Sequence, residues 1–210
     1  MSEVLVLNSS ALGSASISKQ LVQYTLARLR ARDPGLKVVM RDLDAYPIPH
    51  LNTDSATALR GAAPANEAQA AALALSDTLI AELKTADTIV IGAPMYNFGI
   101  PSTLKAWFDY VLRTGVTFRY TEAGPVGLLE GKRAIVIESR GGYYSEGATS
   151  ALDSQEPHLK TLLSFMGIRD VTFIRAEKLG FGSEARQQAL DGARTQLEQL
   201  ITENQYMRAA

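Results

Sequence analysis

The sequence predicts an α/β protein of three layers, in which a parallel sheet of five strands lies between two layers of helices. Short runs rich in Val, Ile and Leu alternate five times with longer segments that have the spacing of amphipathic helices. The 210 residues contain no internal repeat and no Pro- or Gly-rich linker. We therefore expect a single domain over residues 1–210, with right-handed crossovers between its strands.

The first half of the chain begins with an apolar run at 4–8, which is expected to be a strand buried on both faces. Apolar residues then recur at intervals of three and four over 17–29, as in a helix. A more polar run at 36–43 is predicted to be an edge strand. The segment 46–64 is expected to be a long loop, of the kind that usually has a function. The Ala- and Leu-rich segment 66–86 has neither Pro nor Gly and predicts a helix.

The second half contains three further runs that predict strands buried on both faces: 88–94, 134–139 and 171–176. A helix is expected from Pro101, because proline is favoured in the first turn of a helix. Leu and Met residues over 152–166 indicate another helix. The last helix is expected to begin at about Ser183, with Leu, Ala and Ile on one face.

Composition and charge exclude several classes of function. The chain has 21 basic and 22 acidic residues, and this balance gives no reason to expect nucleic acid or an anionic membrane as a partner. It has no Cys, which excludes disulfides and cysteine nucleophiles, and only two His, so no metal site is expected. There is no signal peptide and no apolar stretch of the ~20 residues that a membrane span needs, so we expect a cytoplasmic protein.

Ligands of open parallel sheets bind beyond the carboxyl ends of the strands, where the strand order reverses. In a sheet of order 2-1-3-4-5, that point lies between the first and third strands. Three segments follow the strands there: SSALGSASIS after the first, APMYNFGIP after the third and SRGGYYSEG after the fourth. We expect all three segments to contact one ligand.

The first of these segments joins a strand, a turn of small residues and the start of a helix. Such a segment can bind a phosphate through backbone N–H groups and the helix dipole. The hydroxyls of Ser10, Ser16 and Ser18 would complete the shell. Because G-x-G-x-x-G and G-K-[ST] are both absent, the segment predicts a monophosphate pocket. Alternatively, the serines only cap the first helix.

The other two segments are typical of contacts with a flat heterocycle. Tyr96 and Phe98 flank Asn97 directly after a predicted buried strand, although these rings could instead be buried in the core. Gly141 and Gly142 permit a close backbone approach, and their N–H groups can donate to a carbonyl or to developing negative charge. The alternative for these glycines is a tight turn without a ligand.

A phosphate at one end and a flat, donor-edged heterocycle at the other predict FMN. There is no Cys, and neither His50 nor His158 follows a predicted strand. No side chain is therefore predicted to be catalytic, and the cofactor must carry the chemistry. Both histidines are expected at the surface. The side chain of Arg140 is also expected to be an ordinary surface charge.

The chain resembles the bacterial FMN-dependent NAD(P)H azoreductases and quinone reductases of the flavodoxin-like superfamily in three segments: VLVLNSS, APMYNFGIPSTLKAWFDYVLRTGVTFRYTEAGPVGLLEGKRAIVIESRGG and KLGFG. The resemblance covers nearly the whole chain. It implies a flavodoxin-like fold, one FMN per subunit and a homodimer with two sites at the subunit interface. It also implies a ping-pong cycle of two-electron steps, in which NADH or NADPH is the donor and quinones or aromatic azo compounds are the acceptors.

The resemblance also assigns residues to the site. The phosphate would lie on Ser10, Ser16, Ile17 and Ser18, the isoalloxazine edge on Met95, Tyr96, Asn97 and Phe98, and the flavin carbonyl side on Ser139, Arg140, Gly141 and Gly142. It further implies that Phe118 and Tyr120 help to cover the flavin. Phe173 would reach the partner's site, and Arg60 would contact the nicotinamide donor or the substrate.

Two other functions are compatible with parts of the sequence. A flavodoxin-type electron carrier would use the same fold, but such carriers are usually strongly acidic, and this chain has a formal net charge of −1. A flavin-free hydrolase that uses the serine segment would need a G-x-S-x-G turn, which is absent. The sequence leaves open NADH against NADPH, and quinone, azo or nitro compounds as the physiological oxidant.

Overall fold

The structure, a computed structural model, describes residues 2–61 and 63–202, so residues 1, 62 and 203–210 of the expected domain lie outside the described part. Five parallel strands form one sheet. In spatial order they are β2 (Lys37–Asp42), β1 (Glu3–Asn8), β3 (Thr88–Pro94), β6 (Arg133–Ser139) and β7 (Asp170–Ala176). The expected order 2-1-3-4-5 is confirmed, because β4 (Phe118–Thr121) and β5 (Gly124–Gly127) form a separate antiparallel hairpin.

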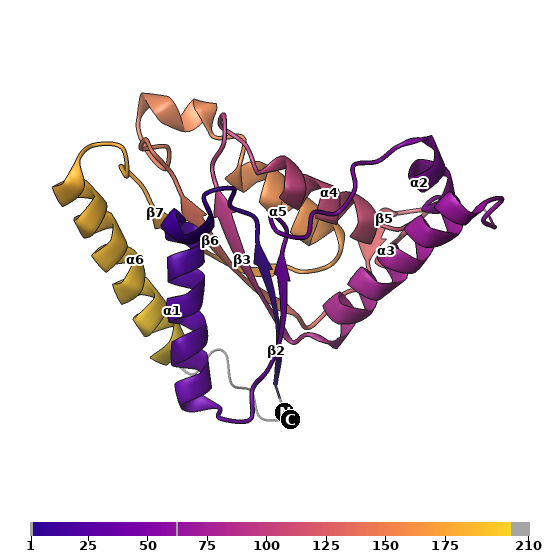
Figure 1. The fold of residues 1–210 in the computed structure, drawn as a ribbon, viewed down its shortest axis with the longest axis horizontal. Helices are drawn as coiled ribbons and strands as arrows, with labels where there is room; N and C mark the ends of the chain where they lie inside the picture. The colour runs from indigo at the N-terminus through magenta and orange to yellow at the C-terminus, as the bar shows by residue number, and fades with distance from the viewer. Residues whose placement is uncertain (1, 62, 203–210) are drawn as a thin grey trace.

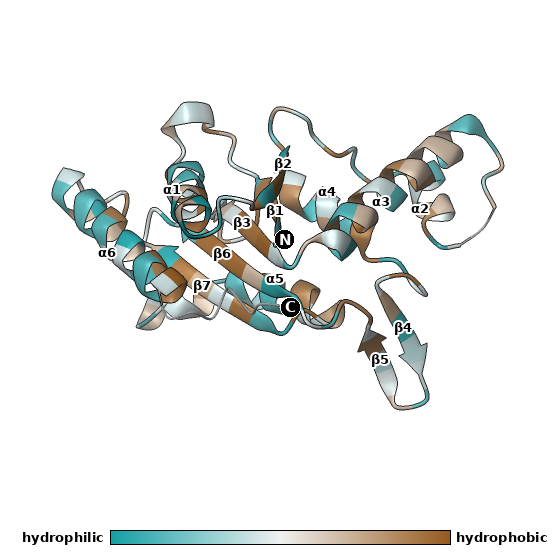
Figure 2. Ribbon diagram, turned by 90° about the horizontal axis from the view of Figure 1, so that it is seen from below, coloured by the Kyte–Doolittle hydropathy of each residue, from teal (hydrophilic) through white to brown (hydrophobic). Residues whose placement is uncertain are grey.

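Helices cover both faces of the sheet, as predicted (Figure 1). One layer contains α1 (Ile17–Arg32) and α6 (Ser183–Thr202), and the other contains α3 (Glu67–Thr85), α4 (Ser102–Val111) and α5 (Glu156–Phe165). Side chains alternate between the faces of a strand, so neighbouring residues of β1 enter different cores. Leu5 packs with α3 and α4, whereas Val6 packs with α1 and α6. Figure 2 shows the apolar central strands between the helices.

The strand β7 differs from its expected burial. The run at 171–176 was predicted to be buried on both faces, but β7 is the edge of the sheet and most of its residues are only half buried. Phe173 and Arg175 are among the half-buried residues. An edge strand lacks a neighbour on one side, so its apolar side chains are covered only by the helices above and below it.

The long segment 46–64 contains a short helix that the sequence analysis did not predict, α2 (Thr53–Ala58). A capping box begins it: the Ser55 N–H donates to Asn52 Oδ1 at 2.9 Å, and the Asn52 N–H donates to Ser55 Oγ at 2.9 Å. The spacing of these two residues was the available signal. The helix contacts α3 and so fixes the position of this otherwise irregular segment.

The helix predicted over 152–166 begins later, at Glu156, and follows a 3-10 turn, η2 (Ala148–Leu152). The carboxylate of Asp153 accepts hydrogen bonds from the N–H groups of Gln155, at 2.8 Å, and Glu156, at 3.1 Å. An acidic side chain that accepts the first free N–H groups of a helix fixes where that helix starts. Among the described helices, none is long and apolar enough to cross a membrane.

The hairpin β4–β5 is held against the turn between α5 and β7 by a close backbone contact (Figure 2). A Cβ atom placed on Gly127 would lie 2.1 Å from the Gly167 nitrogen and 2.3 Å from the Met166 carbonyl carbon. The Leu129 N–H donates to the Met166 carbonyl oxygen at 2.9 Å beside this contact. Glycine is therefore required at 127 for the two backbones to meet.

We predict that Gly127→Ala lowers the free energy of unfolding by about 1–3 kcal/mol or more, because the added methyl group must push the hairpin away from that turn. Gly192→Ala is the matched control: this glycine lies on the exposed side of α6, and a Cβ atom there would have no neighbour within 4 Å. The control should gain up to about 1 kcal/mol from helix propensity. Urea denaturation followed by circular dichroism measures both changes, and equal stability of the two variants would contradict the contact.

Candidate functional site

Three loops meet at the carboxyl ends of β1, β3 and β6, where the sequence analysis placed a ligand. Parallel pairing aligns Pro94 with Ser139, and the Met95 N–H then donates to the Ser139 carbonyl oxygen at 2.9 Å. The Tyr96 hydroxyl accepts a hydrogen bond from the Ala11 N–H at 3.1 Å and lies 3.3 Å from Ser10 Oγ. Tyr96 thus joins the loop after β3 to the serine loop after β1.

The serine loop presents hydroxyl groups at the start of α1. Ser16 is the N-cap residue, and its Oγ accepts a hydrogen bond from the Lys19 N–H at 3.1 Å, so the capping role that was the alternative is real. The Ser16 and Ser18 hydroxyls are 3.1 Å apart, and both side chains, with that of Ser10, are buried. The N–H groups of Ile17 and Ser18 have no partner within the helix because they belong to its first turn. Hydroxyls and amides together suit a phosphate group.

The nearest basic side chain of this loop is already paired. Lys19 Nζ lies 2.5 Å from Asp42 Oδ2, at the end of β2, and both side chains are partly buried. Lys19 therefore neutralises a carboxylate of its own chain. The charge of a bound anion would have to be stabilised by the helix dipole and neutral donors of the serine loop.

The loop after β3 has a strained backbone. Asn97 and Phe98 have φ values of 47° and 71°, in the left-handed region that non-glycine residues rarely adopt. Reciprocal hydrogen bonds between Tyr96 and Gly99, at 3.0 and 3.1 Å, hold this turn closed. The Phe98 ring is 45% exposed, so it is not buried in the core as the alternative supposed. Strain that persists in a well-bonded loop is typical of binding sites.

The glycine loop after β6 is fixed by its carbonyl groups. The Gly180 N–H donates to the Gly141 carbonyl oxygen at 2.9 Å, and the Lys178 N–H donates to the Gly142 carbonyl oxygen at 2.7 Å. Gly141 is exposed, and a Cβ atom there would have no neighbour within 4 Å. The loop therefore has open space beside it, into which a flat ligand could approach the backbone.

The expectation that Arg140 is a surface charge was wrong, because its side chain is completely buried. Its Nη2 lies 2.7 Å from Glu138 Oε2 and 3.0 Å from Asp153 Oδ2. Its Nε donates to Gln155 Oε1 at 3.0 Å, and its Nη1 donates to Glu177 Oε1 at 3.2 Å. Buried charges need such partners. The available sequence signal was Glu138, an opposite charge only two residues before Arg140.

Burial also changes the protonation of Glu138. Desolvation raises the pKa of this carboxyl to about 8, and the nearby carboxylates of Glu156 and Asp153 act in the same direction, against the opposing charge of Arg140. Its Oε1 has no hydrogen-bond partner among the described residues. Burial therefore opposes the ionisation of Glu138 in the folded protein, against the attraction of Arg140.

The remaining predicted site residues lie apart from the three loops or at their margin. The Phe118 ring is buried and packs on Phe165, with centroids 4.6 Å apart, whereas Tyr120 is 68% exposed. Phe173 lies beneath Lys160, whose Nζ is 5.3 Å from the ring centroid. Arg60 is exposed just beyond α2. Of the hairpin aromatics, Tyr120 is thus the one that presents its ring to solvent.

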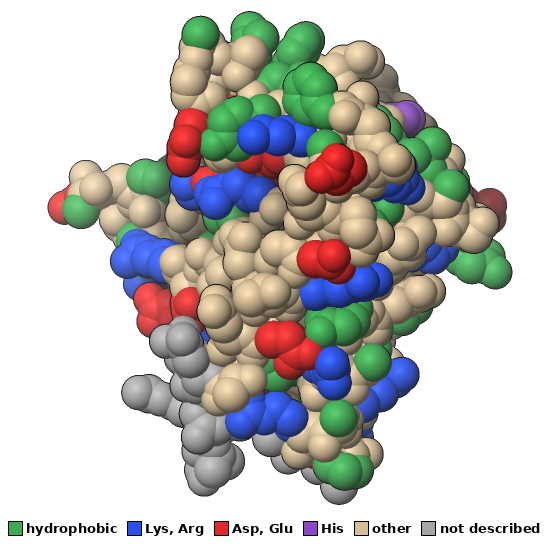
Figure 3. All heavy atoms as spheres, turned by 90° about the vertical axis from the view of Figure 1, so that its left-hand side faces the viewer, with side chains coloured by type: hydrophobic (Ala, Val, Ile, Leu, Met, Phe, Trp, Pro, Cys, Tyr) green, Lys and Arg blue, Asp and Glu red, His purple; other side chains and the backbone are tan. Residues whose placement is uncertain are grey.

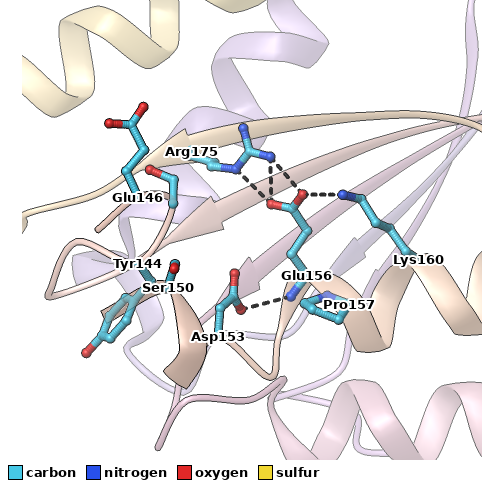
Figure 4. Close-up of a pocket in the computed structure, with 9 residues that line it drawn as sticks. Tyr144, Glu146, Ser150, Asp153, Glu156, Pro157, Lys160 and Arg175 are labelled. Carbon is cyan, nitrogen blue, oxygen red and sulfur yellow. Dashed lines mark hydrogen bonds and ion pairs between the residues drawn. The ribbon is translucent and has the colours of Figure 1, made fainter. Parts of the chain in front are cut away.

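Two further features of the described residues give no reason to expect a second site. The described residues contain no cluster of three or more His, Asp or Glu that could hold a metal ion. A hollow of ≈ 390 Å³ lies beside Tyr144, and Figure 4 draws the residues that line it. Its cations are already paired, because Arg175 Nη2 lies 2.7 Å and Lys160 Nζ lies 2.6 Å from the two oxygens of Glu156. Of the histidines, His50 is exposed and His158 is partly exposed on α5.

We predict that Glu138 makes stability depend on pH. Its pKa is about 8 in the folded protein against an ordinary 4.5, so the folded state keeps a proton that the unfolded chain releases. The free energy of unfolding should therefore fall as pH rises from about 5 to 8, and level off above. Glu138→Gln should flatten this dependence and be more stable than the native protein at pH 8. Urea denaturation at several pH values tests this, and parallel curves for both proteins would contradict it.

Comparisons with known proteins agree with this geometry. Residues 2–201 match the family model described as having a flavodoxin-like fold. The FMN-dependent NADH:quinone oxidoreductase of Hyphomonas neptunium is 55% identical over 94% of each chain. The enzyme of the same name from Azotobacter vinelandii is 52% identical over 95% of this chain and 100% of its own.

A solved structure is similar over nearly the whole chain. The FMN-dependent NADH-azoreductase of Bacillus anthracis, determined in complex with FMN, is 25% identical, with a TM-score of 0.87. The match covers 97% of this chain and 99% of the azoreductase. The sequence comparison and the structure comparison thus point to the same group of proteins. The chain belongs to the flavodoxin-like family that includes these FMN-dependent NADH:quinone oxidoreductases.

Proposed function

We propose that this chain is an FMN-dependent NADH:quinone oxidoreductase. The observation that carries the proposal is the junction of three loops at the end of the sheet, where a hydroxyl-lined helix start lies beside a strained aromatic loop and an open glycine loop. This arrangement fits a phosphate at one end and a flat ring at the other. The names of the two relatives described above support the same activity.

The serine loop would hold the FMN phosphate. Ser10, Ser16 and Ser18 supply hydroxyl donors, and Ile17 and Ser18 supply first-turn N–H groups. These side chains are buried before any ligand arrives, so little rotamer freedom remains to be lost on binding. The pocket needs no lysine, because the helix start itself favours negative charge.

The other two loops would hold the ring. The backbone of Met95, Tyr96 and Asn97 and that of Gly141 and Gly142 would contact its polar edge, where N–H donors stabilise the negative charge that develops on reduction. FMN, when bound, supplies the chemistry, since its ring accepts a hydride from NADH and returns two electrons to a quinone. The chain's own task is to bind, orient and partly cover the ring.

We also propose a ping-pong order, in which NADH and the oxidant occupy the same open face in turn. The exposed rings of Phe98 and Tyr120 suit flat molecules of either kind, and Arg60 would contact the donor or the oxidant. Aromatic azo compounds would need two such cycles, four electrons in all. In a homodimer, Phe173 would reach the partner's site, and Phe118 and Tyr120 would help to cover the flavin.

An electron carrier of flavodoxin type has less support. Carriers use a strong field of one sign to attract protein partners. This chain has a formal net charge of −1. Figure 3 shows acidic and basic side chains intermixed over the side of the molecule where α6 lies. A small-molecule substrate is therefore favoured over a protein partner.

The first experiment is an anaerobic visible spectrum of the protein with added FMN, before and after NADH. We expect a bound-flavin spectrum that NADH bleaches at once, without a reductase partner, and that benzoquinone restores. Bound flavin that NADH cannot bleach would instead support the carrier. Absence of flavin binding would refute the proposal, and the serines would then have only their capping role.

The phosphate pocket predicts a second result. Ser18→Ala should raise the Kd for FMN by about ten- to hundredfold, because a hydrogen bond to a charged group contributes about 1.5–3 kcal/mol. The Kd for riboflavin, which lacks the phosphate, should not change. Ser14→Ala is the matched control, since Ser14 is an exposed serine of the same loop. Fluorescence titration measures both constants, and an equal rise for riboflavin would contradict a phosphate role.

A further inference from the structure

The buried guanidinium of Arg140 contacts three separate parts of the chain that surround the glycine loop. It pairs with Glu138 near the end of β6, with Asp153 and Gln155 just before α5, and with Glu177 after β7. Its backbone is also fully engaged, because its N–H donates to the Ala176 carbonyl oxygen at 2.9 Å and its own carbonyl oxygen accepts from the Leu179 N–H at 3.2 Å. The side chain is therefore unavailable for direct contact with a ligand.

One set of hydrogen bonds in this network leads to the aromatic loop. The Gln155 side chain accepts from Arg140 Nε and donates through Nε2 to the Ala93 carbonyl oxygen at 2.9 Å. Next to it, the Ser154 N–H donates to the Phe98 carbonyl oxygen at 3.0 Å. Arg140 thus fixes Gln155, which holds the end of β3 just before the strained turn at 96–99, and the neighbouring Ser154 bonds the turn itself.

A second set of contacts leads from Arg140 through Glu177 to the segment at Tyr144, beside the glycine loop. Glu177 accepts hydrogen bonds from the Tyr144 N–H at 2.8 Å and the Ser145 N–H at 3.1 Å, with the same Oε1 that faces Arg140. The Tyr144 ring meets the Phe98 ring edge to face, with centroids 6.0 Å apart. The contacts through Gln155 and those through Glu177 therefore meet at the turn that is expected to contact the flavin ring.

Further charged side chains surround this arrangement. Asp153 and Glu156, at the start of α5, face Arg140, and Arg175 of β7 pairs with Glu156 in turn. Figure 4 shows Arg175, Glu156 and Lys160 joined in one line of ion pairs behind the loops. A lysine at 140 would keep the positive charge but could not reach partners in several directions, because it lacks the planar fork of guanidinium nitrogens.

We propose that Arg140 is a positioning residue for the flavin ring. Its side chain holds the aromatic loop through Gln155 and the segment at Tyr144 through Glu177, without touching the cofactor. The proposal rests on the proposed function, since it concerns the same site. It assigns the Arg140 side chain a role that differs from the direct cofactor contact implied by the resemblance. The serine loop is not a partner of Arg140, so the phosphate contribution to binding should be independent of it.

The experiment compares the native protein with Arg140→Lys, Gln155→Met and Arg133→Lys. Arg133 is the matched control: it begins β6, at the opposite end from Arg140, which directly follows that strand, and it pairs with Asp170 at 2.8 Å. Fluorescence titration gives the Kd for FMN and for riboflavin, and circular dichroism of the bound flavin reports the surroundings of its ring. If Arg140→Lys fails to fold, Gln155→Met carries the test, because it removes the Arg140–Ala93 link without removing a charge.

We expect Arg140→Lys and Gln155→Met to raise both constants by the same factor, tenfold or more, and to alter the circular dichroism of the bound flavin. The ratio of the riboflavin and FMN constants should stay at its native value, whereas Ser18→Ala should lower it. Unchanged constants, a ratio that falls towards one, or an equal loss in Arg133→Lys would overturn the positioning role. A native protein that binds neither flavin would overturn the proposed function instead.

Discussion

The parallel register of β1, β3 and β6 is the constraint on which the rest of the structure depends. Pairing of Asn8 with Gly92 and of Pro94 with Ser139 makes the three strands end at the same edge of the sheet. The loops that follow must therefore meet there, whatever their sequences. The hydrogen bond from Met95 to Ser139 and the contacts of the Tyr96 hydroxyl with the serine loop are direct consequences of this register.

Behind those loops, a charge has been buried where an apolar residue could have been. Burying a guanidinium is costly, and its attraction to carboxylates roughly offsets that cost only when the geometry is good and the hydrogen bonds are complete. Arg140 has four such partners, Glu138, Asp153, Gln155 and Glu177, and only Glu138 Oε1 among their buried side-chain oxygens and nitrogens stays without a hydrogen bond. The directionality of these bonds, more than their net energy, is what an apolar residue could not provide. The cluster sets the positions of loops that have few apolar contacts of their own.

The strands and most helices could be predicted because their patterns are local. The run at 88–94 became β3 at both boundaries, and the helix predicted from about Ser183 begins there. Examples of departures from the prediction are α2, which was missed, α5, which begins at Glu156, and β7, which is only half buried. In each case the missing information was a contact or a cap, such as that of Asp153, and not a periodicity.

By itself, the sequence predicted the fold class and the three loops of the candidate site. These depend on hydrophobic periodicity and on short motifs at strand ends, which are properties of neighbouring residues, whereas the strand order was taken from the likeness to flavodoxin-like proteins. Only the tertiary structure decided where the side chain of Arg140 lies. It was expected at the surface and is fully buried. Its partners Gln155 and Glu177 are 15 and 37 residues away. A charge is stable in the interior only when such distant partners converge on it, and their convergence exists only in the folded chain.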